Sequence, residues 1–233
     1  MFYFDPTYLL WVALPAMLLS LLVQGRLKST FAKWSRVPNS ERYTGMQVAQ
    51  MIFNRTSLNT IPLEPTAGAL TDHYDPRANV VRLSEPVCTQ PSVASMAIAA
   101  HELGHVQQYQ TGSPMIAARS FLLPALQFTP TISYMAFMLG FALSLVGLMW
   151  IGVFFFGVVV VFSLLTVPIE IDASRRGLKL LEDAGLLDTP EERQGARQML
   201  GAAGWTYIAA AATSLMQLLY YVSLVKRSGR SRY

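Results

Sequence analysis

The sequence predicts a mostly α-helical integral membrane protein, with about four transmembrane helices and a small α+β domain with a short β-sheet. Three observations predict this class. Of the 233 residues, 52% are hydrophobic and 14% are charged, whereas a soluble domain carries about 25% charged residues. The apolar residues are concentrated in long runs, and the stretch 121–169 contains no charged residue. The polar remainder holds an H-E-x-x-H motif at 101–105, in surroundings that favour a helix.

The first membrane segment is expected within residues 1–25. Residues 8–23 are largely apolar, and basic residues follow them, whereas no Lys or Arg precedes them. Because Lys and Arg remain on the cytoplasmic side, this segment is expected to be a retained anchor with an outer amino terminus. At about 16 residues it is slightly short for a span, and residues 2–4 could extend it.

Residues 26–120 are predicted to form the domain that contains the histidine motif. Helical spacing of apolar residues predicts a helix over 44–58 with Thr44 near its N-cap. Pro, Gly and short apolar segments then predict two or three short strands, with a polar turn at 71–77 and a strand at 79–83. Ser92 is expected to cap the motif helix, which should stop at Gly112.

The remaining elements are expected to return to the membrane. The stretch 121–169 is long enough for a hairpin of two spans, because one span takes about 20 residues, and we expect its turn near 146–152. Residues 170–203 are polar again, and Thr189-Pro190-Glu191-Glu192 predicts a capping box that opens a further helix. A last span is expected at 204–225, followed by a basic tail at 226–233.

The H-E-L-G-H motif carries the predicted chemistry. On a helix, His101 and His105 share one face and can bind one zinc ion, one Zn²⁺ per chain. Glu102 could then reach a metal-bound water as a general base. The chain contains only three His, which makes a chance match unusual. Two structural histidines on a helix are the alternative interpretation.

A hydrolytic zinc site also needs a third protein ligand. A chain that leaves the motif helix and crosses the membrane twice must return on the side it left. Glu170 is the first acidic residue after the hairpin, and we therefore predict it to be the third ligand. Asp172 is the competitor, two positions further on and thus on a different helix face.

Several motifs together resemble the YugP-like family, which comprises neutral zinc metallopeptidases of bacterial membranes. They are LTDHYDPR at 70–77, VRLSE at 81–85, HELGH at 101–105, PIEIDASRR at 168–176 and LLDTPEE at 186–192. The resemblance implies a membrane-bound zinc endopeptidase of the gluzincin type, distantly similar to HtpX-like proteases.

In those proteases an E-x-x-x-D motif supplies the third ligand, and its Asp orients a zinc-binding His. Glu170 takes the ligand position here, and Ser174 stands in place of the Asp. Asp172 or another residue could therefore orient the histidine instead.

Other residues are candidates for contacts with the reacting peptide. A second donor is expected to stabilise the developing oxyanion, and the candidates are His73, Tyr74, Arg77 and Arg175. A hydrogen-bonded turn is the simpler role for residues 72–75. An outer strand formed by Asn79, Val80, Val81, Arg82 and Leu83 could bind an extended substrate by strand addition.

These expectations describe a zinc endopeptidase that cleaves peptide or membrane-protein substrates at the surface of the lipid bilayer. The alternative is a catalytically silent zinc-binding membrane scaffold or adaptor, which the intact Glu102 disfavours. An intramembrane protease is disfavoured because the apolar run before His101 is too short to span. A transporter is disfavoured because 121–169 carries no ionisable group.

Charge indicates the location. No basic stripe with aromatic residues points to nucleic acid, and a homo-oligomer is left open. The many Lys and Arg in 26–119 and 175–197 place the catalytic domain in the cytoplasm, and the resemblance implies a bacterial inner membrane. Four crossings would leave the basic tail outside. Either the last segment does not fully cross, or the more numerous Lys and Arg of the other segments set the orientation despite the charge of the tail.

Overall fold

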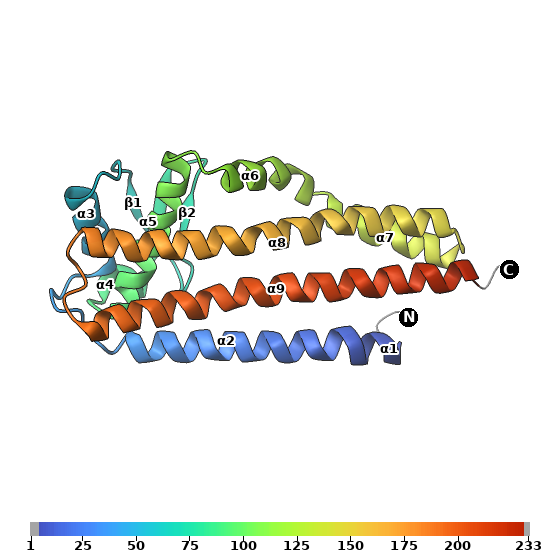
Figure 1. Ribbon diagram of the computed structural model, residues 1–233, viewed down its shortest axis with the longest axis horizontal. Coiled ribbons are helices and arrows are strands. Elements are labelled where there is room, and N and C mark those ends of the chain that lie inside the picture. Colours follow the sequence, from blue (N-terminus) through green and yellow to red (C-terminus); the bar gives the residue numbers. More distant parts are fainter. Residues whose placement is uncertain (1–4, 231–233) are drawn as a thin grey trace. The chain divides into compact units, whose positions relative to one another are not determined.

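The computed structural model describes residues 5–230 (Figure 1). The proposed extension of the anchor through residues 2–4 and the end of the basic tail lie outside the described residues. The chain forms two compact units. One comprises Met1–Leu22, Ala117–Pro168 and Thr206–Tyr233, and the other comprises Val23–Ile116 and Ile169–Trp205. Most of the described chain is helical, and a small mixed sheet of three strands is present, which confirms the predicted fold class.

Most residues of the apolar runs belong to the first unit, although the helices that contain them continue into residues of the second. Three helical stretches are long and apolar enough to cross a membrane: Pro6–Trp34, Val146–Asp183 and Pro190–Gly229. The first of these begins with α1 (Pro6–Tyr8) and a π-helical stretch, η2 (Leu9–Ala13), and continues as α2 (Leu14–Trp34). Helices α6 (Pro114–Leu126) and α7 (Thr129–Ala142) meet at a bend of 50° and together make a fourth candidate. The described chain therefore has three candidate spans, or four if the bent pair is a single span, in agreement with the expectation of about four.

The turn of the predicted hairpin lies earlier than expected. Helix α7 ends at Ala142 and α8 (Val146–Asp183) begins at Val146, so the prediction of a turn at 146–152 is wrong. Ser144 takes a left-handed backbone conformation in the connection, with φ of 56°. Gly152 lies inside α8, where an added Cβ would come within 2.8 Å of the Phe137 backbone. This glycine permits close helix packing and does not form a turn.

Two pairs of predicted elements are single helices. Helix α8 contains both the second half of the hairpin and Glu170, which therefore lies inside a helix and not at its start. Helix α9 (Pro190–Arg230) likewise joins the capped helix to the last apolar run. Its predicted capping box is present, because Thr189 Oγ1 accepts from the Glu192 amide and the Glu192 carboxylate accepts from the Thr189 amide.

The second unit packs around α5 (Val93–Gln110), most of whose residues are buried. The Ser92 hydroxyl caps its start, and Gly112, with φ of 63°, follows its end. Helix α3 (Gly45–Arg55) begins with a capping box formed by Thr44 and Gln47. The predicted N-caps at Thr44 and Ser92 and the stop at Gly112 are confirmed, whereas α3 ends at Arg55, earlier than the predicted residue 58. The short α4 (Glu85–Thr89) connects the sheet to α5.

The sheet has the strand order β1-β3-β2. Strand β1 (Leu63–Thr66) pairs in parallel with β3 (Val80–Ser84), and β2 (His73–Asp75) pairs antiparallel with the other side of β3. The stretch 79–83 is therefore not the outer strand that was expected. Residues 73–75, expected in a turn, form an edge strand instead.

Small residues bring α5 and α8 into close contact. A Cβ on Gly177 of α8 would lie 2.6 Å from the carbonyl oxygen of Ala100. A Cβ on Gly104 of α5 would overlap the carbonyl oxygen of Ala173. Backbone therefore packs against backbone on both sides of this contact, which fixes the spacing between the side chains that the two helices present to each other.

Candidate metal centre

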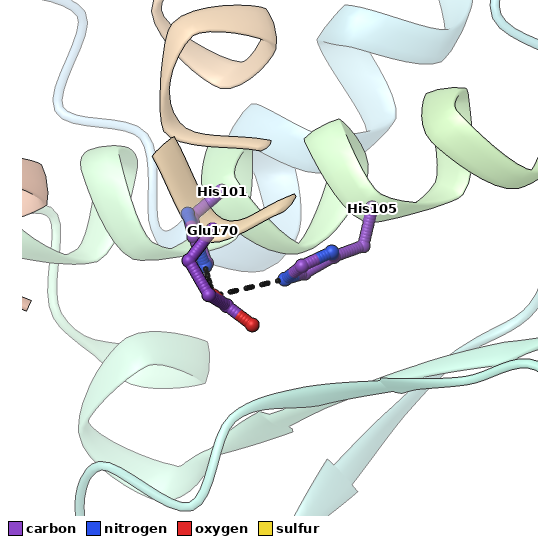
Figure 2. Close-up of side chains that lie close together, drawn as sticks. All are labelled: His101, His105 and Glu170. Atoms are coloured by element: carbon purple, nitrogen blue, oxygen red, sulfur yellow. Dashed lines mark ion pairs between the residues drawn. The ribbon is translucent and has the colours of Figure 1, made fainter. Parts of the chain in front are cut away.

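Helices α5 and α8 bring His101, His105 and Glu170 together. Figure 2 shows both imidazoles on one side of α5, with the carboxylate of Glu170 between them. Glu170 Oε2 lies 3.3 Å from Nε2 of His101 and 3.4 Å from Nε2 of His105. One ligand atom from each of the three residues lies within 4.8 Å of the others.

These separations fit a tetrahedral metal ion. Two ligand atoms about 2.1 Å from a tetrahedral zinc lie about 3.4 Å from each other. Glu170 Oε2 is buried and has no hydrogen-bond partner among the described residues, which is unusual for a buried carboxylate. Two imidazole nitrogens and one carboxylate oxygen form a donor set that suits zinc and leaves a fourth position open.

The electrostatics of the site also favour a cation. Burial alone would lower the pKa of His105, but the nearby carboxylates of Glu102 and Glu170 outweigh burial and raise the pKa. A proton on His105 is thus stabilised by negative charge. A divalent ion at the same place would meet the same negative potential.

Gln108 determines which nitrogen of His105 faces the site. Its Nε2 donates to the carbonyl oxygen of Ile169 and to the Asp172 carboxylate, both at 2.8 Å. Its Oε1 must therefore face His105 Nδ1, 3.0 Å away, so Nδ1 is the donor. The lone pair of a neutral His105 then lies on Nε2, directed at Glu170.

Ser174 contacts Nδ1 of His101, as Gln108 contacts Nδ1 of His105. Its hydroxyl lies 3.2 Å from Nδ1 of His101, at the position where the resemblance pointed to an Asp. Asp172, the competing ligand, instead accepts from Gln108 and from Arg176 Nε, the latter at 2.7 Å. Asp172 therefore contacts Gln108, the partner of His105, and is not part of the cluster of His101, His105 and Glu170.

Glu102 is buried beside the ligands, with a relative exposure of 7%. Its Oε2 accepts a hydrogen bond of 2.9 Å from the backbone amide of Tyr74, in the edge strand β2. Burial raises the pKa of Glu102 above its usual range, against the opposing effect of the two histidines. A buried carboxylate with a raised pKa is a suitable proton acceptor near neutral pH.

The other candidates for substrate contacts have contacts of their own. The ring of His73 is bound to the Thr71 carbonyl through Nδ1 at 2.8 Å, and the hydroxyl of Tyr74 donates to Asn79 at 2.9 Å. Arg82 pairs with Glu64 and Asp75. Arg77 and Arg175 are exposed. Within residues 5–230, no side-chain hydrogen bond or ion pair joins any of these residues to His101, His105 or Glu170.

Sequence reasoning missed Gln108. Its position gave a signal, because it lies three residues after His105 on a helix and therefore near the same face. Its partners on α8 are 61 and 64 residues away in the chain, and no local pattern identifies them.

Comparison with known proteins identifies the family to which the sequence is similar. The family model described as "Putative neutral zinc metallopeptidase" matches residues 9–226. The chain is also similar to the "Putative membrane protease YugP" of Bacillus subtilis strain 168, with 36% identity over 215 residues, covering 92% of this chain and 95% of that protein. No solved structure matches the chain significantly. His101, Glu102, His105 and Glu170 all lie within the matched residues.

Proposed function

This chain belongs to the family described as putative neutral zinc metallopeptidases, and we propose that it is a membrane-bound zinc endopeptidase acting on protein substrates at the membrane surface. One observation carries the proposal. A buried carboxylate, Glu102, follows His101 directly in the chain, and the cluster of His101, His105 and Glu170 has a spacing that fits zinc. A purely structural site would need the three ligands but not Glu102.

The metal ligands in this proposal are Nε2 of His101, Nε2 of His105 and the Glu170 carboxylate. Zinc in such a site lowers the pKa of water to about 7 and acts as a Lewis acid towards a carbonyl. Gln108 and Ser174 hold the two imidazoles in the orientation that keeps their Nε2 lone pairs available.

Glu102 is assigned the role of general base. The Tyr74 amide holds Oε2, so Oε1 is the oxygen assigned to take the proton from the attacking water. The same carboxyl then delivers that proton to the nitrogen of the leaving amine, which restores the carboxylate. The hydrogen bond from Tyr74 limits rotation of the carboxyl group and keeps it oriented for both transfers.

The substrate is assigned to the edge of the sheet at β2. Strand β3 is paired on both sides, so it has no free backbone edge for strand addition. Strand β2 pairs with β3 on one side only and supplies the amide that contacts Glu102. A peptide bound along β2 would lie beside the proposed base, and backbone hydrogen bonds would bind it with little sequence selectivity.

The proposal extends to location. Helix α5 is absent from the candidate spans of the described chain. Helix α8 is one of these spans, but Glu170 lies just after its apolar run, which ends at Ile169. The metal centre is therefore assigned to a surface of the bilayer and not to its interior. The basic residues in 26–119 and 175–197 favour the cytoplasmic side of a bacterial inner membrane.

The test uses the full chain purified in detergent, with zinc content and casein cleavage as readouts. Wild type should hold one zinc and cleave, Glu102→Gln should keep zinc and lose cleavage, and Glu170→Ala should lose zinc. Asp183→Asn is the matched control, because Asp183 is an exposed acid on the same helix. Zinc binding without cleavage in the wild type would favour the silent scaffold, and a folded wild type that binds no zinc would exclude both functions.

A further inference from the structure

A groove of about 730 Å³ lies beside the start of α9, and no residue of the metal centre lines it. Its charged lining consists of Arg26 from α2, Arg193 and Arg197 from α9, and Asp188, which precedes α9. Arg193 and Arg197 are four residues apart on one helix and lie on the same face. Arg26 comes from a different helix, so the cationic groups converge from two elements.

The positive charge of this groove is only partly neutralised. Arg193 pairs with Glu182. Within residues 5–230, neither Arg26 nor Arg197 has a recorded ion-pair or hydrogen-bond partner for its side chain. Two guanidinium groups thus remain available at one surface, each with several donors in a planar fork that matches the oxygens of a phosphate.

The groove changes character along α9. Gly201 provides room, because an added Cβ there would meet nothing within 4 Å. Trp205 lines the groove with half of its surface exposed, at 50%. It follows Arg193 by twelve residues, about 18 Å along the helix axis. One end of the α9 lining is cationic, and the other is aromatic.

Helices α2 and α9 both continue from this groove into apolar runs. Arg26 follows the apolar residues 8–23 in α2, and Trp205 precedes the apolar residues 206–225 in α9. Arg and Trp are characteristic of the headgroup level of a membrane, where a charged group and an amphipathic ring both find partners. The groove therefore offers arginines at one end and Trp205, beside an apolar run, at the other. A phospholipid has the same order, with a charged headgroup followed by apolar acyl chains.

We propose that this groove binds the phosphate headgroup of an anionic phospholipid from the surrounding bilayer. Arg26 and Arg197 contact the phosphate oxygens, and Trp205 packs beside the glycerol backbone and the first methylenes. The aromatic end distinguishes this ligand from an acidic peptide or a free phosphate, neither of which needs an apolar end beside the charge. The site is independent of the proposed peptidase activity.

The test counts bound lipid on the full chain by native mass spectrometry after delipidation in a neutral detergent. Separate titrations use dioleoylphosphatidylglycerol, dioleoylphosphatidylcholine, inorganic phosphate and a Glu-rich hexapeptide. Wild type should bind phosphatidylglycerol most tightly. The double variant Arg26→Gln/Arg197→Gln should weaken that binding by at least about tenfold. Each Arg near the membrane surface adds a similar amount to the attraction of anionic lipid, and the variant loses two of them.

The control is Lys28→Gln/Arg36→Gln, which removes the same charge from exposed positions that do not line the groove. It should bind phosphatidylglycerol like the wild type. Equal losses in both double variants would show a diffuse charge effect and overturn the proposal. It would also be overturned if the hexapeptide displaced the lipid, or if phosphate alone bound as tightly as phosphatidylglycerol. If the double variant does not fold, the single variant Arg197→Gln is tested in its place, and a smaller loss of affinity for phosphatidylglycerol is expected. Wild-type affinity in that variant would overturn the proposal.

Discussion

Gln108 accepts a hydrogen bond from Nδ1 of His105 at 3.0 Å, while its amide group holds α8 through the Ile169 carbonyl and Asp172. One side chain therefore orients a proposed metal ligand on α5 and at the same time binds the helix that supplies Glu170. Gln108 is completely buried, so the loss of any of these bonds leaves polar groups without water to replace them.

Replacement of Gln108 by Leu should weaken zinc binding by about 10- to 100-fold, the usual cost of losing a partner that orients a metal ligand. Zinc affinity is measured by competition with a chelator. Gln50→Leu, the same change at an exposed position on α3, is the control and should keep wild-type affinity. Equal affinity in Gln108→Leu and wild type would show that Gln108 does not orient the ligand.

Two substitutions of Ser174 should affect zinc affinity differently. Its hydroxyl contacts Nδ1 of His101, so Ser174→Ala should weaken zinc binding several-fold. Ser174→Asp should bind zinc at least as tightly as the wild type, because a carboxylate accepts from Nδ1 and makes the imidazole a more basic ligand. Isothermal titration with zinc measures both. A Ser174→Asp variant that binds less zinc than Ser174→Ala would contradict this role.

Local signals in the sequence predicted helix starts well. Thr44, Ser92 and Thr189 were all expected near N-caps and are found there, because a capping side chain satisfies amides only two or three residues away. The three residues proposed as metal ligands were also expected to lie together, since two follow from helical spacing and the third from the direction in which a membrane hairpin returns. All three appear in the cluster.

Nonlocal features were not predictable in the same way. The pattern of residues 79–83 indicates a strand but does not say whether its neighbours pair on one side or on both, and β3 proved to be central. The continuity of α8 and α9 was not predicted, because Pro168 and Gly204 lie at the changes between polar and apolar residues and are residue types that usually mark helix ends. The role of Gln108 depends on partners more than 60 residues away.

The contact between Gly104 and Ala173 provides a prediction about stability. A methyl group on Gly104 would overlap a backbone carbonyl of α8, and backbone cannot move aside as a flexible side chain can. Gly104→Ala should destabilise the protein by about 1–3 kcal/mol and should also lower zinc affinity, because α8 carries Glu170. Gly25→Ala is the control, since an added Cβ there meets nothing within 4 Å. Thermal unfolding in detergent measures both variants, and equal midpoints would argue against a tight contact between α5 and α8.

The dependence of zinc binding on pH follows from His105. Its pKa is raised because the carboxylates of Glu170 and Glu102 outweigh the effect of burial, so a proton competes for the site at a higher pH than it would at an ordinary histidine, whose pKa is about 6.5. Zinc binding requires the neutral imidazole and releases this proton. Apparent affinity should therefore be nearly constant well above the raised pKa and should fall by about tenfold per pH unit below it, with one proton displaced. Chelator competition between about pH 8 and about pH 5 at fixed ionic strength measures this dependence. An affinity that begins to fall only below about pH 6 would mean that the carboxylates do not raise the pKa of His105, and that another group dominates the competition between proton and metal.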